Sequence, residues 1–94
     1  MNIVIAQAVI NELPNDFDSH EFIQKFLTMY EKEYIELLHS YISAKDGRIF
    51  RAAHAKIGDY LLQNSKQLNI EDTVRVKSMN IKGNNTENQK WAKV

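Results

Sequence analysis

The chain has no cysteine, a single proline and only three glycines among its 94 residues. Without cysteine it can form neither a disulfide framework nor a thiolate metal site, and this absence fits a reducing compartment. The chain also lacks an apolar run long enough to span a membrane, and the first residues, MNIVIAQAVI, contain no basic leader. We therefore expect a cytoplasmic protein without a membrane partner.

An excess of charge of either sign is also missing, because 12 Lys and Arg residues balance 12 Asp and Glu residues. The two halves nevertheless differ. Residues 1–44 carry two lysines against seven carboxylates, a balance of −5, whereas residues 45–94 carry ten cations against five carboxylates, a balance of +5. This asymmetry predicts a partner of defined charge, either a nucleic acid or an acidic protein surface. The alternative is that the two halves of the chain pair with each other.

The remaining composition is that of one small globular domain, with 44% hydrophobic and 26% charged residues. A chain of this length buries roughly 60 to 65% of its unfolded surface, so it folds with little stability to spare. A homodimer would add buried surface, and we keep it as a possible assembly.

Apolar residues at helical spacing predict three helices, over about 3–13, 19–42 and 48–66. Pro14 ends the first of them, although the β-branched residues near its start would also permit a short strand. The second begins where Asp18 can cap the helix while Glu21 reaches back to the cap. Asn64 or Asn69 is expected to end the third.

The carboxy-terminal stretch 73–94 is predicted to form a β-hairpin. Its apolar residues change face near Lys77 and Ser78, which predicts a β-bulge there. The loop KGNNTENQ contains residues that tolerate a positive φ, as a hairpin tip requires. We expect Trp91 to anchor the hairpin on the helical core.

These elements predict an α+β fold, mainly α, with three helices followed by a C-terminal hairpin. The order resembles the winged helix, in which a helix-turn-helix precedes a hairpin whose tip reaches along the nucleic-acid backbone. The resemblance implies a non-catalytic module for duplex DNA, with the helix from Arg48 in the major groove. The residues that we expect to contact phosphates or bases are Arg48, Arg51, Lys56, Gln63, Lys77, Lys82, Asn84, Asn85 and Lys90.

The alternative function is protein–protein interaction or dimerisation. The second predicted helix carries more apolar surface than one small core requires, and it is rich in tyrosine. Tyr30, Tyr34 and Tyr41 would then lie at a subunit interface, where a ring with a polar tip is favoured.

We expect no enzyme activity, no cofactor and no metal. The best metal-type motif is the pair Glu36 and His39, but a di-iron site needs two such pairs and two further glutamates. No serine lies in a nucleophile-elbow context, and no glycine-rich phosphate loop is present. His54 is predicted to lie at the edge of the core.

Overall fold

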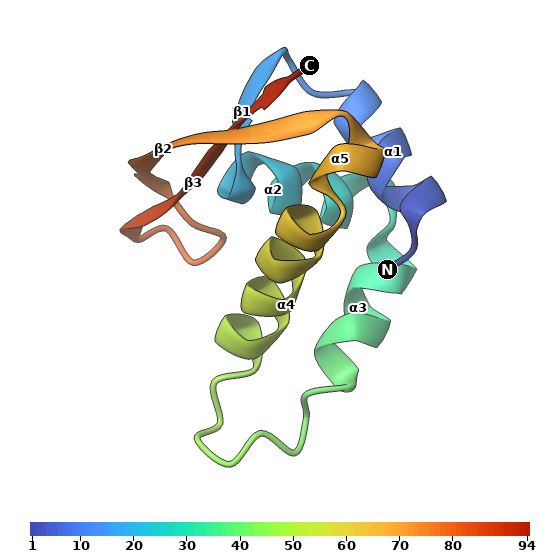
Figure 1. Ribbon diagram of the computed structural model, residues 1–94. Helices are drawn as coiled ribbons and strands as arrows, with labels where there is room; N and C mark the ends of the chain where they lie inside the picture. The colour runs from blue at the N-terminus through green and yellow to red at the C-terminus, as the bar shows by residue number, and fades with distance from the viewer.

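The computed structural model describes residues 1–94 and contains five helices and three strands. In chain order they are α1 (Ile3–Asn11), β1 (Asp16–Asp18), α2 (Ser19–Met29), α3 (Glu31–His39), α4 (Ile49–Gln63), α5 (Ser65–Leu68), β2 (Ile70–Met79) and β3 (Asn85–Lys93). Figure 1 shows the sheet at one end of the molecule and α3 and α4 extending away from it, joined at the far end by residues 40–48. None of the helices combines the length and apolar character needed to cross a bilayer. The chain forms a compact α+β domain.

Local capping accounts for the starts of the first two helices. The side chain of Asn2 accepts a hydrogen bond from the Ile5 amide, and the segment after it is helical rather than extended. At α2, the Asp18 carboxylate accepts from the Glu21 amide (2.8 Å), and the Glu21 carboxylate accepts from the Asp18 amide (3.1 Å). The capping box predicted from the sequence is therefore present.

The prediction of one continuous helix over 19–42 is wrong, because the chain leaves the helical conformation at Tyr30 (φ −131°, ψ 57°). The bend brings the ring of Tyr34 edge-on to that of Phe26, with centroids 6.0 Å apart. Eight residues along a straight helix would separate the two by about 12 Å. No glycine or proline marks the break, so packing around Phe26, and not local propensity, accounts for its position.

The predicted helix over 48–66 is also divided, at Asn64, into α4 and the short α5. The Tyr60 carbonyl accepts hydrogen bonds from both the amide (3.0 Å) and the side chain (2.9 Å) of Asn64, which closes the end of α4. Asn69 then ends α5 in the left-handed conformation (φ 55°, ψ 46°), which asparagine tolerates better than most residues. Each of the two asparagines considered as a helix end thus ends one helix.

The sheet contains a strand that the sequence did not predict. β1 pairs antiparallel with β3, and the strand order is β1-β3-β2, so the strands are not confined to the C-terminal hairpin. A segment of three residues is too short to show an alternation of apolar and polar side chains, so β1 has no signal in the sequence.

The irregularity of the β2–β3 hairpin lies between Asp72 and Arg75. The bulge predicted near Lys77 and Ser78 is wrong, because the pairing is regular there.

One hydrophobic core joins the helices to the sheet. Its largest fully buried side chains are Val9, Ile10, Phe17, Phe22, Phe26, Ile57, Leu61, Leu68 and Trp91. Trp91 on β3 is only 1% exposed, and its indole N–H donates to the Ser19 hydroxyl at the start of α2 (3.0 Å). The prediction that Trp91 anchors the hairpin on the helical core is confirmed.

Candidate functional site

A groove of about 810 Å³ lies between the start of α4 and the tip of the β2–β3 hairpin. The α4 side contributes Arg48, Phe50 and Arg51, and the hairpin side contributes Lys82 and Asn84. In Figure 1 the hairpin loop and the first turns of α4 lie on the same side of the molecule, away from α3. The groove therefore brings together two segments that are more than 30 residues apart in the sequence.

The charge of the groove is mainly positive. Arg48, Arg51 and Lys82 face a single carboxylate, that of Glu87. The one salt bridge in the molecule joins Lys32 and Glu36 on α3, so none of the three cations of the groove is neutralised by an ion pair. Unpaired cations that share a concave surface favour an anionic ligand.

The hairpin tip that presents Lys82 is held in shape by Asn80. The Asn80 carboxamide oxygen accepts hydrogen bonds from the amides of Lys82 and Asn84, both at 3.0 Å. The Asn80 amide donates to the Asn84 carbonyl (2.8 Å), which closes the loop. Gly83 within it has a φ of 82°, a conformation that costs glycine little. These bonds give the tip a defined shape without engaging the lysine side chain.

A polar network fixes the hairpin relative to α2. The buried carboxamide of Asn88 accepts from the His20 amide (2.9 Å) and donates to the Val76 carbonyl (3.3 Å) and the Ser78 hydroxyl (3.2 Å). The ring of His20 contacts the same hydroxyl through Nδ1 at 2.8 Å. Because these groups come from α2, β2 and β3, the network sets the direction in which the hairpin leaves the domain.

His54 lies on the wall of the groove at α4 and is hydrogen-bonded to the core. Its Nε2 is 2.7 Å from the Tyr34 hydroxyl of α3. Burial, and secondarily the charge of His20, lowers the pKa of His54 to about 4, and burial raises the pKa of Tyr34. At neutral pH His54 is therefore an uncharged ring, and the positive charge of the groove comes from arginine and lysine.

Phe50 exposes its ring in the same groove. Phe50 lies at helical spacing with Ile57 and Leu61, which are buried, yet Phe50 itself is 39% exposed. It lies in the first turn of α4, and the first buried residue of that helix is Ala53. The periodicity of the sequence identifies the apolar face of a helix but not the point along it where the core ends.

The structure brings together four of the nine residues predicted to contact nucleic acid: Arg48, Arg51, Lys82 and Asn84. The other five lie outside the groove: Lys56 and Gln63 are exposed farther along α4, Lys77 and Asn85 are exposed on the hairpin, and Lys90 is half-buried beside β1.

The tyrosines expected at an interface lie in different environments. Tyr34 is only 6% exposed and belongs to the core, whereas Tyr30 and Tyr41 are half-buried. Tyr34 therefore offers little surface to a partner. The motif residues Glu36 and His39 are both exposed on α3, and no group of three or more His, Cys, Asp or Glu residues is placed to hold a metal ion.

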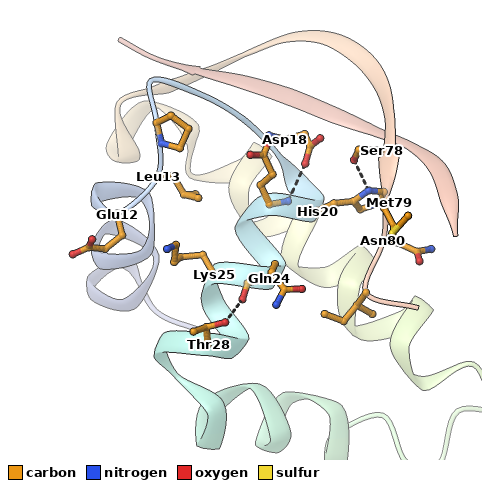
Figure 2. A pocket seen from close by; sticks show the side chains of 13 residues that line it. Glu12, Leu13, Asp18, His20, Gln24, Lys25, Thr28, Ser78, Met79 and Asn80 are labelled. Carbon is orange, nitrogen blue, oxygen red and sulfur yellow. Dashed lines mark hydrogen bonds between the residues drawn. The ribbon is translucent and has the colours of Figure 1, made fainter. Parts of the chain in front are cut away.

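A second hollow, of about 630 Å³, lies on the other side of the hairpin tip, between α1, α2 and the end of β2 (Figure 2). Its carboxylates are Glu12, Asp18 and Glu21, against the single cation Lys25. The capping box of α2 already engages two of these carboxylates. The two hollows share His20 of α2 and Asn80 and Ile81 of the hairpin loop, so an acidic and a basic surface meet beside the hairpin tip.

Among the residues of the groove that sequence reasoning missed are Phe50, His20 and Glu87. The environment of His20 depends on Ser78, 58 residues away, and no local pattern signals such a contact. Comparisons of the chain with protein-family models, with curated proteins and with solved structures give no match, so the interpretation of the groove depends on its own geometry and chemistry.

Proposed function

We propose that this chain is a non-catalytic nucleic-acid-binding module of winged-helix-like architecture, with the β2–β3 hairpin as its wing. The observation that carries the proposal is the groove in which Arg48, Arg51 and Lys82 lie together without an ion-pair partner. Phosphate groups are the ligands that suit such a set, because they are anionic and accept several hydrogen bonds at once.

The order of the elements supports the same proposal. The hairpin follows the last helices directly, and its tip stands beside the start of α4. In a winged-helix arrangement the helix and the wing contact the same nucleic acid, so a shared groove between them is expected. Likeness of fold does not establish function, and the side chains of the groove carry the argument.

The chemistry of the hairpin tip adds neutral donors to the cations. The side chains of Asn84 and Thr86 line the groove next to Lys82 and can donate to phosphate oxygens. Three phosphate contacts predict that the logarithm of the affinity for duplex DNA falls with the logarithm of salt with a slope of about −2.7. Between about 50 and 200 mM salt the affinity would then fall about 40-fold.

Fluorescence anisotropy of a labelled DNA duplex, titrated with protein across a salt series, tests this proposal. The test variant is Arg48→Glu combined with Lys82→Glu, which reverses one charge on each wall of the groove. The control variant is Lys32→Glu combined with Lys66→Glu, which changes the net charge equally at two exposed lysines outside the groove.

We expect salt-dependent binding by the wild type and the control variant, and none by the groove variant. The absence of salt-dependent binding by the wild type at low salt, to the duplex and to a single strand of the same sequence, would refute the proposal. Equal weakening by the two variants would show that overall charge, and not the groove, accounts for binding. A dimer in sedimentation without nucleic-acid binding would favour an assembly module.

A further inference from the structure

The groove contains an aromatic surface as well as positive charge. The ring of Phe50 packs on His54 with their centroids 5.6 Å apart, and His54 stacks on Tyr34 at 5.9 Å with an angle of 26° between the rings. Tyr34 in turn contacts Phe26 in the core. A continuous series of rings thus leads from the core to the exposed face of Phe50.

This series holds Phe50 in place before any ligand binds. An aromatic ring that is partly exposed and immobilised loses little conformational entropy when another ring stacks on it. His54, uncharged at neutral pH, packs against Phe50 as a polar aromatic ring. The free face of Phe50 lies in the groove that Arg48 and Arg51 also line.

A partly exposed aromatic ring between unpaired cations has the composition of a site for unpaired nucleotides. In a duplex the faces of the bases are covered by their neighbours, and a protein reaches only the base edges in the grooves. In a single strand the face of each base is available to stack on an aromatic ring while cations contact the backbone. A duplex would use the cations of this groove but not the face of Phe50.

We propose that the groove binds a single-stranded segment of nucleic acid, with one unpaired base stacked on Phe50 and the adjacent phosphates contacted by Arg48, Arg51 and Lys82. This inference rests on the proposed function and specifies its ligand. In this proposal Phe50 contacts the base and the cations contact the phosphates, so the sugar is not recognised. Single-stranded DNA and RNA therefore offer the same chemistry to the groove.

The test compares four labelled probes of matched sequence: single-stranded DNA, single-stranded RNA, a blunt DNA duplex, and the same duplex with a single-stranded overhang. Anisotropy titrations at several salt concentrations use the wild type and Phe50→Leu. Leucine retains an apolar side chain that can pack on His54 but has no ring on which a base can stack. Thermal unfolding of both proteins checks that the variant is folded.

We expect the single-stranded and overhang probes to bind more tightly than the blunt duplex. Phe50→Leu should weaken their binding by about 5- to 150-fold, the range of one base–aromatic stack. The salt dependence should not change, because no cation is removed. The affinity for the blunt duplex should be the same in both proteins.

A second variant, Phe50→Trp, reports stacking directly. Tryptophan keeps an aromatic face at this position, and a stacked base should quench its fluorescence. The native Trp91 is buried against α2 and provides an internal reference that a base in the groove does not reach. We expect quenching of Phe50→Trp by the single-stranded probes and no quenching of the wild type.

The outcomes separate this inference from the proposed function. If Phe50→Leu binds single strands as tightly as the wild type, or if the blunt duplex is preferred, the inference is wrong. The proposed function then still stands, provided that Arg48→Glu with Lys82→Glu abolishes binding. If no probe binds in a salt-dependent manner, both proposals fail. Tighter binding of either the single-stranded DNA or the single-stranded RNA identifies which nucleic acid supplies the unpaired base.

Discussion

Asn88 provides the sharpest test of how the hairpin is positioned. Its side chain is only 6% exposed and makes three hydrogen bonds, one to α2 and two to β2. The capping box of α2 satisfies the amide of Glu21 but not that of His20, and Asn88 supplies the missing acceptor. Asn88→Ala removes all three bonds and leaves a helix-start amide without its partner.

The expected cost follows from this arrangement. Three neutral hydrogen bonds at about 1 kcal/mol each predict that the free energy of unfolding falls by about 3 kcal/mol. For a domain of this size each kcal/mol lowers the unfolding temperature by roughly 4 to 8 °C, so the midpoint should fall by about 12 to 24 °C. Because the same network directs the hairpin, affinity for nucleic acid should fall as well.

Urea and thermal unfolding followed by circular dichroism measure this loss. Asn85→Ala is the matched control, since Asn85 lies on the same strand but is exposed. If Asn88→Ala and Asn85→Ala differ by less than about 0.5 kcal/mol, the reasoning is refuted, because surface substitutions commonly fall within that range.

Three further predictions concern pH, backbone conformation and charge. Because the pKa of His54 falls from its ordinary 6.5 to about 4 on folding, the unfolded chain binds a proton first as the pH falls. Stability present above pH 6.5 should therefore decline toward pH 4, by about 1 kcal/mol at pH 5 after allowance for partial exposure. Unfolding in urea at pH 7 and 5 should show this loss in the wild type and in His39→Gln, but not in His54→Gln. Asn69→Ala should destabilise the protein by about 1 kcal/mol in urea unfolding, because alanine is strained at positive φ. Asn69→Gly should be nearly neutral, since glycine adopts a positive φ readily. Equal effects of the two substitutions would contradict the role of Asn69 as a left-handed cap. Glu87→Gln removes the only carboxylate of the groove and should raise the affinity for nucleic acid about 2- to 5-fold at low salt in anisotropy titrations. Glu71→Gln, outside the groove, is the control, and the same gain in affinity there would argue against a local effect.

Features encoded within a few neighbouring residues could be predicted from the sequence. The capping box at Asp18 and Glu21 depends on residues three positions apart, and the structure contains it. The helical spacing of apolar residues identified α1 and α4, and the alternation and turn residues near the end identified the hairpin. The separation of charge between the two halves was also visible, and part of the positive half lines the groove.

The sequence misled where contacts between distant residues decide the conformation. The break at Tyr30 depends on packing around Phe26, and no residue at the break signals it. The three residues of β1 become a strand only because β3, more than 65 residues later, pairs with them. Local propensity is weak compared with the burial and hydrogen bonding that tertiary contacts provide.

The sequence by itself determined the identity of the elements that have strong local signals, the burial of Trp91 and the supply of basic residues in the second half. Only the tertiary structure decided which of those basic residues share a surface. Arg48, Arg51, Lys82 and Asn84 meet because the Asn88 network directs the hairpin toward the start of α4. The exposure of Phe50 likewise depends on where the core ends along α4. A residue's spacing in the chain specifies its face on a helix, whereas its neighbours across the groove depend on how whole elements pack.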